Sequence, residues 1–226
     1  HDALRRNKRS IALNLKSPEG RRVAEQLAQW ADVLVEGFRP GVAARLGLDY
    51  PTLAKLNPRL VYCSLSGYGH SGPYRDVVGH DVNYIALGGQ LSTNGRQGGK
   101  PAIPLNVVGD IAGGGLLAAF GIMQALYVRE RTGRGQHLDL AMSDGVLYLM
   151  AWHAGRVLAG QAAPRPGMGR LGGEMPYYDV YECADGQWLS LGCYDSHFWK
   201  ILCTVLELPH LIPWQHDPAH RAEVRA

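Results

Sequence analysis

Two residues in the middle of the chain carry side chains suited to moving a proton. His80 stands in the run GHDVNY, where a loop should lead into a helix, and Asp110 stands in NVVGDIAGGG, where a long apolar helix should begin. A histidine titrates near neutral pH and can accept or donate a proton. A carboxylate at the start of a helix lies at the positive end of its dipole. General acid–base chemistry is therefore one interpretation of the pair.

Each of these residues also has a simpler interpretation. Aspartate is one of the preferred helix-capping residues, and a single histidine is more often structural or on the surface. The glycines from Gly113 to Gly115 favour a site after Asp110, because they should leave bare backbone for the close approach of a ligand. Asn106, four residues before Asp110, could donate a hydrogen bond to the carboxylate and hold it in one rotamer.

Other chemistries find little support in the motifs. The nine histidines are scattered, and the densest group, HDPAH at 216–220, falls in a polar tail, so we expect no metal site. SLSGYG and AMSDG do not match the elbow that carries a nucleophilic serine. The sequence has no phosphate-binding loop ending in Gly-Lys-Ser or Gly-Lys-Thr, and GGGLLAAFG is only a weak match to a dinucleotide-binding fingerprint.

The elements around these residues alternate between strands and helices. A strand is predicted at 10–16, and a helix follows the Ser17-Pro18-Glu19 start signal. Strands at 32–38 and 59–69 enclose short helices at 40–48 and 50–56. This order predicts a parallel, doubly wound α/β sheet with ligands beyond the carboxyl ends of its strands, at Lys16, Gly37–Arg39 and Gly67–Gly72.

The second half of the chain should begin with a long central helix and end in a smaller domain. Apolar residues from Asp110 to Tyr127 predict a buried helix, followed by a strand at 137–142 and a helix at 143–160. We expect a large domain over 1–160, a Pro- and Gly-rich linker over 161–176, and the start of a second domain over 177–226. That domain should open with a hairpin around an Asp-Gly turn, followed by a helix whose apolar face is Phe198, Leu202 and Val205.

Composition places the chain among soluble globular proteins. It has 226 residues, 46% of them hydrophobic, and a formal net charge of +3. No window approaches the roughly 20 apolar residues of a membrane span, and no export signal is visible. The four separated cysteines predict free thiols in a reducing cytoplasm. Because the chain opens on a charged stretch that runs into a strand, we expect it to begin in mid-domain, with its N-terminal part missing.

The basic run RRNKR at 5–9 has two interpretations. Such runs are usually solvated faces, but Arg and Lys also suit the geometry of a phosphorylated ligand. Nucleic acid is not expected as a partner, because the run lacks interleaved aromatic residues and the chain is not strongly basic overall.

Seven segments in this order resemble family III CoA transferases of the CaiB/BaiF type, and within them the alpha-methylacyl-CoA racemases. These segments are NKRSIALNLKSPEG, VLVEGFRPGVAARLGLDY, SLSGYGHSGPY, GHDVNYIALGG, NVVGDIAGGG, ERTGRGQHLDLAMSDG and YYDVYECADGQWLSLG. The resemblance implies a Rossmann-like large domain, a smaller α+β domain, and an interlocked homodimer with each active site between subunits. It also implies an acyl-CoA substrate, no separate cofactor, no metal, and no nucleic-acid or membrane partner.

The same resemblance assigns roles to residues of this chain. His80 and Asp110 match the catalytic pair, Asn106 would support Asp110, and Asp195 stands where racemases carry a glutamate that pairs with the histidine. Glu174, in GGEMPYY, also departs from the family's sequence and is the alternative to Asp195 as the acid that reaches the site. The stretches that would contact CoA are Leu13, Asn14, Leu15 and Lys16; Gly37, Phe38 and Arg39; Arg45; and Gly79, Asp81, Val82, Asn83 and Tyr84.

Two reactions remain open at this point. In a racemase, one base removes the α proton of a 2-methylacyl-CoA and the other returns a proton to the opposite face, so both His80 and Asp110 are needed. In a CoA transferase, the aspartate attacks the acyl-CoA to form an acyl anhydride, and no histidine is expected at the position of His80. The presence of His80 favours racemisation.

Overall fold

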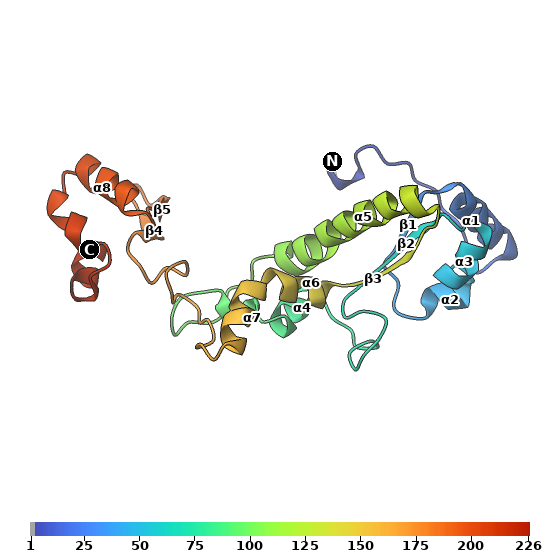
Figure 1. Cartoon of the computed structure of the whole chain (residues 1–226), viewed down its shortest axis with the longest axis horizontal. Coiled ribbons are helices and arrows are strands. Elements are labelled where there is room, and N and C mark those ends of the chain that lie inside the picture. Colours follow the sequence, from blue (N-terminus) through green and yellow to red (C-terminus); the bar gives the residue numbers. More distant parts are fainter. Residues whose placement is uncertain (1–2) are drawn as a thin grey trace. The chain divides into compact units, whose positions relative to one another are not determined.

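The computed structural model describes residues 3–226, which form two compact units (Figure 1). The first unit comprises the chain up to Leu87 together with Leu105–Leu149, and the second comprises Gly88–Pro104 together with Met150–Ala226. This division differs from the expected domains 1–160 and 177–226. The second unit takes in a segment from the middle of the sequence, and the predicted linker 161–176 lies within it.

The first unit is built on a parallel sheet of three strands, as the sequence predicted. The strands are β1 (Val33–Glu36), β2 (Val61–Ser66) and β3 (His137–Ala141), in that spatial order. Glu36 lies opposite Ser64, which in turn lies opposite Asp139. Since the strands are parallel, their carboxyl ends meet at one edge, where the loops after β1 and β2 and the start of the helix after β3 come together.

The strand predicted at 10–16 is wrong. Residues 8–14 are neither helix nor strand, and the Ile11 side chain is 62% exposed. The apolar alternation is present, but a strand also needs a neighbouring strand to receive its backbone hydrogen bonds. Among the described residues no strand pairs with this segment.

Three helices are linked to the apolar core on one side of the sheet: α1 (Pro18–Trp30), α2 (Val42–Leu46) and α3 (Tyr50–Leu56). Helix α1 begins as predicted, because the Ser17 hydroxyl accepts a hydrogen bond from the Gly20 amide at 3.1 Å and Pro18 occupies the first helical position. A buried apolar cluster joins these helices to β2; its members are Ala28, Leu48, Leu53, Leu60 and Tyr62.

The long helix runs from a π-helical segment, η3 (Val107–Leu116), into α5 (Leu117–Thr132). It was expected to be buried, and this is wrong for the single chain: Leu116, Phe120 and Met123 are 59–68% exposed. Along α5 the side that faces the sheet is covered, where Ala118 and Ala125 are buried. By length and composition the Val107–Thr132 helix could also cross a membrane, contrary to the expectation that no such window exists.

Two further helices of the first unit pack against η3: α4 (Asp81–Leu87) and α6 (Met142–Leu149). The helix predicted at 143–160 is divided in two, because α6 ends at Leu149 and α7 (Ala151–Leu158) begins after Met150. The division between the two units falls at the same residue.

The second unit contains the predicted hairpin, β4 (Tyr178–Glu182) and β5 (Trp188–Gly192), with Gly186 at φ +76° in its turn. Helix α8 (Ser196–Val205) follows, and short helical segments complete the unit: η2 (Leu91–Thr93), η4 (Pro209–Trp214), η5 (Pro218–His220) and α9 (Arg221–Arg225). The first unit also opens on the single turn η1 (Ala3–Arg5).

The predicted apolar face of α8 is wrong. Phe198 and Val205 are 49% and 74% exposed, whereas Trp199 and Cys203 are buried. These two residues pack with Tyr177 and Leu211 in the core of the second unit. The true buried face lies one position later along the helix, and Leu202 is at its margin. The four cysteines are free, as predicted.

Candidate active site

His80 is the residue immediately before α4 and caps its N-terminus through the backbone. Its carbonyl accepts hydrogen bonds from the amides of Asn83 at 2.8 Å and Tyr84 at 3.2 Å. Its own amide donates to the Asn83 side-chain oxygen at 3.1 Å, so His80 and Asn83 satisfy each other's hydrogen-bonding groups across this turn. The backbone of His80 is thereby fixed, while the residue is exposed, which leaves the imidazole accessible.

Asp110 lies in the first turn of η3 and is half-buried. Asn106, which precedes η3, donates from its amide nitrogen to Asp110 Oδ2 at 3.3 Å. The hydrogen bond expected from the four-residue spacing is therefore present. The carboxylate has one oxygen held by Asn106.

The side chain of Asp81 joins the two segments that carry His80 and Asp110. Its Oδ2 accepts hydrogen bonds from the amides of Gly109 at 2.7 Å and Asp110 at 2.8 Å. Asp81 is the first residue of α4 and directly follows His80, and only 5% of it is exposed. One buried carboxylate thus ties the N-terminus of α4 to the N-terminus of η3, and brings His80 and Asp110 into one neighbourhood.

The tight packing around this junction explains its glycines. A Cβ at Gly109 would lie 2.8 Å from Asp81 Oδ2, and one at Gly79 would lie 2.7 Å from the Tyr68 hydroxyl. The Tyr84 hydroxyl donates to the Gly79 carbonyl at 2.5 Å. Burial raises the pKa of Tyr84, and the neighbouring Tyr68, Asp110 and Asp81 add to the shift. Tyr84 therefore stays protonated and acts as a donor that fixes the loop before His80.

The glycines that follow Asp110 have a different role from the one expected. Gly113 and Gly114 are buried, and a Cβ on Gly113 would lie 3.0 Å from the Val146 amide of α6. On the opposite helix, a Cβ on Gly145 would run into the Gly113 carbonyl. Gly113 and Gly145 thus allow η3 and α6 to approach closely. Among Gly113, Gly114 and Gly115, only Gly115 is exposed. Bare backbone for a ligand is not what Gly113 and Gly114 provide.

The residues predicted to contact CoA lie at several places in the first unit. Gly37–Arg39 follow β1 directly, and a Cβ at Gly37 would lie 3.7 Å from the Leu65 carbonyl of the neighbouring strand. Phe38 and Arg39 are exposed, and so is Arg45 in the last turn of α2. In the 79–84 stretch, Asp81 and Tyr84 are buried and Asn83 is exposed.

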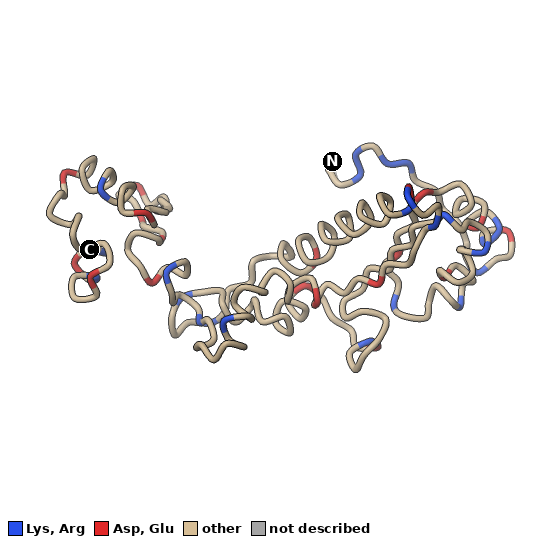
Figure 2. The backbone as a smooth tube through the Cα atoms, viewed as in Figure 1, with Lys and Arg blue, Asp and Glu red and all other residues tan. Residues whose placement is uncertain are grey.

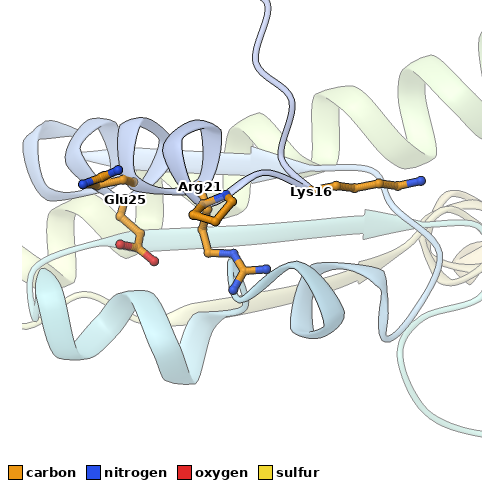
Figure 3. A pocket seen from close by; sticks show the side chains of 5 residues that line it. Lys16, Arg21 and Glu25 are labelled. Carbon is orange, nitrogen blue, oxygen red and sulfur yellow. The ribbon is translucent and has the colours of Figure 1, made fainter.

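A basic cavity of about 410 Å³ lies at the start of α1, lined by Lys16, Pro18, Arg21, Arg22 and Glu25 (Figure 3). Leu13–Lys16 lead into it, with Leu15 packed against the core. In Figure 3 the strands point toward the side on which Lys16 extends, so this end of the cavity lies on the side of the carboxyl ends of the strands. Figure 2 shows further Lys and Arg residues along this N-terminal part of the chain.

Arg21 and Arg22 were not among the predicted site residues. The available signal was the Arg-Arg pair in the first turns of the helix that follows Lys16. A Cβ on Gly47, the residue after α2, would lie 3.6 Å from the Arg21 side chain, so Arg21 reaches from α1 toward the end of α2. The cavity has three cations and one acid, which suits an anionic ligand.

Asp195 and Glu174 belong to the second unit. Asp195 precedes α8, where its carbonyl accepts from the Trp199 amide at 3.1 Å, and its side chain is exposed. Glu174 is bound within its own unit: it pairs with Arg221 at 2.8 Å and accepts from the Gly169 amide at 2.6 Å. Within the described residues no cluster of three or more His, Cys, Asp or Glu side chains could hold a metal ion.

Comparisons with known proteins bear on this arrangement. The family model described as CoA-transferase family III matches residues 2–225. Human "Alpha-methylacyl-CoA racemase" is 44% identical over 207 residues, which cover 91% of this chain and 54% of that protein. "Acetyl-CoA:oxalate CoA-transferase" of Acetobacter aceti is 39% identical over 215 residues, covering 91% of this chain and 52% of that protein.

A solved structure resembles the whole fold. A CAIB/BAIF family protein from Brucella suis has a TM-score of 0.80 and 31% identity, covering 96% of this chain and 60% of that one. The chain thus spans about half the length of the curated relatives it matches. The extent of the family match and the level of identity lead to one conclusion: the chain belongs to CoA-transferase family III.

Proposed function

We propose that this chain provides the catalytic part of an enzyme that racemises 2-methylacyl-CoA thioesters by transferring the α proton between His80 and Asp110. The observation that carries the proposal is the junction of α4 and η3. There an exposed histidine and a carboxylate oriented by Asn106 stand on two helix N-termini tied together by one side chain. Inversion through a planar enolate needs a base on each face of the α carbon, and the pair supplies two.

The proton balance of the reaction is simple. In one direction neutral His80 removes the α proton, the electron pair moves onto the thioester oxygen, and protonated Asp110 delivers its proton to the opposite face of the carbon. His80 is then cationic and Asp110 anionic, which is the state required for the reverse direction. The two residues exchange roles between enantiomers, and no further cofactor is required.

The basic cavity at the start of α1 supports binding of the CoA part of the substrate. Lys16, Arg21 and Arg22 offer cationic donors to phosphate groups, and Arg39 and Arg45 are exposed in the same unit. We propose that coenzyme A enters as part of the substrate, with its phosphates on these residues. The thioester would then be directed toward the junction of α4 and η3.

We also propose that the protein is a homodimer in the cytoplasm. The support is the outer face of the long helix, where Leu116, Phe120, Met123 and Tyr127 are each at least 59% exposed. Apolar surface of this extent on a helix that is not in a membrane is expected to be covered by another protein chain. A second copy of this chain is the partner that the family resemblance implies.

CoA transfer is the second candidate function. It is favoured by the position of Asp110, whose carboxylate is held and half-buried as a nucleophile would be, and by relatives named as CoA-transferases. In this reaction the Asp110 carboxylate attacks the acyl carbon and displaces the CoA thiolate. An anhydride forms between the acyl group and Asp110; the thiolate then attacks the Asp110 carbonyl, which releases the first acid and leaves an Asp110–CoA thioester. The carboxylate of a second acid attacks this thioester and frees the thiolate again. Attack of the thiolate on the second acid's carbonyl in the new anhydride gives the second acyl-CoA and regenerates the Asp110 carboxylate. His80 has no defined part in that sequence.

The two functions differ in what they do to the α hydrogen. We would incubate the full-length protein with one enantiomer of a 2-methylacyl-CoA in D2O. Racemisation predicts α deuterium and loss of optical purity, and His80→Ala should abolish both. Transfer of CoA from the 2-methylacyl-CoA to another acid without α exchange, together with trapping of acyl-Asp110 by hydroxylamine, would instead establish the transferase.

A further inference from the structure

We infer that Asp81 is a positioning residue that sets the separation of His80 and Asp110 and makes the two bases act on the same carbon. The inference rests on the proposed racemase function. It concerns a side chain that touches neither proton-transfer group directly but is linked to both through the backbone. Asp81 follows His80 in the chain, and its carboxylate accepts from the amide of Asp110 itself at 2.8 Å.

The link between the two bases is short. From His80 the path crosses one peptide bond to Asp81, then the Asp81 side chain, then one hydrogen bond to the Asp110 amide. A second hydrogen bond, from the Gly109 amide at 2.7 Å, prevents rotation about the first. The carboxylate is buried and has little freedom, so displacement of α4 relative to η3 would break both bonds together.

The site is shaped for a carboxylate in this position. Two amide donors converge on one oxygen, at the start of η3, where a negative charge is favoured by the helix dipole. Gly109 has no room for a side chain, because a Cβ there would lie 2.8 Å from Oδ2 and 3.3 Å from the Asp81 Cα. The other oxygen, Oδ1, is buried without a hydrogen-bond partner among the described residues. An amide nitrogen placed there would find no acceptor.

Asp81 should therefore affect the two candidate reactions differently. Two-base racemisation depends on the positions of both His80 and Asp110 at once, and small displacements of a catalytic group cost rate steeply. Anhydride formation uses Asp110 alone. A loosened junction should lower the rate of α exchange while substrate affinity, which rests on the distant basic cavity, is retained.

The test measures α-deuterium exchange in the full-length protein with Asp81→Asn and, as matched control, Asp144→Asn. Asp144 is an exposed acid in the first turn of α6, so its substitution removes the same charge at another helix start. We expect kcat for exchange to fall about tenfold to hundredfold in Asp81→Asn, with KM within about twofold of wild type. Asp144→Asn should stay near wild type in both constants.

One further variant separates positioning from a purely structural role. Asp81→Glu keeps the carboxylate and should recover at least part of the activity; if Asp81→Asn does not fold, this variant carries the test, with exchange slower than wild type at unchanged KM.

The outcomes are distinguishable. Exchange in Asp81→Asn equal to that in Asp144→Asn, or exchange in Asp81→Glu equal to wild type when Asp81→Asn does not fold, would overturn the positioning role. Absence of exchange in the wild-type protein would instead overturn the racemase function, and the inference with it.

Discussion

A single methyl group at Gly109 should break the junction between α4 and η3. In Gly109→Ala the new Cβ would lie 2.8 Å from Asp81 Oδ2, 3.1 Å from its Cγ and 3.3 Å from its Cα. Contacts below 3.0 Å are not tolerated, and the backbone of Asp81 blocks a simple retreat of its side chain. Overpacking of this kind costs about 1–3 kcal/mol. The better helix propensity of alanine returns at most about 1 kcal/mol of it.

Gly115→Ala is the matched control, because it lies in the same π-helical segment and is exposed. Its Cβ would meet only the Asp110 carbonyl, at an ordinary 3.6 Å. We expect the control to be neutral or slightly stabilising, and Gly109→Ala to unfold at lower urea concentration and to exchange α hydrogen more slowly. Equal unfolding midpoints for the two variants would refute the packing of Gly109 against Asp81.

Three further predictions concern the rest of the first unit and the thiols. Lys16→Gln should raise KM for an acyl-CoA several-fold at low salt, with kcat unchanged, whereas Lys55→Gln, outside the basic cavity, should not; equal KM values would contradict a phosphate role. Burial lowers the pKa of His137, so the unfolded chain binds more protons below about pH 6.5. The free energy of unfolding should therefore fall as the pH drops through that value, and His137→Asn should flatten the slope in urea titrations. Burial raises the pKa of Cys63 to about 11, so an aromatic disulfide reagent at pH 8 should label exposed Cys183 rapidly and Cys63 only after unfolding; equal rates would contradict the burial of Cys63.

Much of the first unit could be predicted because its signals are local. The Ser17-Pro18-Glu19 start of α1 acts within one turn, and the short apolar runs of β1, β2 and β3 are bounded by turn residues. The hydrogen bond from Asn106 to Asp110 also follows from spacing along a single segment. Predictions of this kind need no knowledge of what the segment packs against.

The errors arise where the outcome depends on distant partners. The segment at 10–16 has strand-like alternation, but the described sheet offers it no neighbouring strand. The long helix has an apolar composition, yet along α5 only the side that faces the sheet finds partners among the described residues. The buried face of α8 depends on which side meets Tyr177, and periodicity alone did not identify Trp199.

The role of Asp81 shows the same limit within the site. The family resemblance assigns Asp81 to a stretch that contacts CoA, whereas its side chain is turned into the protein toward Gly109 and Asp110. These partners lie 28 and 29 residues away along the chain. Contacts between residues that far apart in the sequence cannot be predicted from local patterns, because they depend on how the whole chain folds.

The most direct test of the proposed function is the fate of the α hydrogen. A pure enantiomer of a 2-methylacyl-CoA, incubated with the full-length protein in D2O, should gain one α deuterium and lose its optical purity at matching rates, and His80→Ala should do neither. If the substrate instead keeps its α hydrogen with the wild-type protein while CoA passes to another acid, two-base proton transfer at His80 and Asp110 is contradicted.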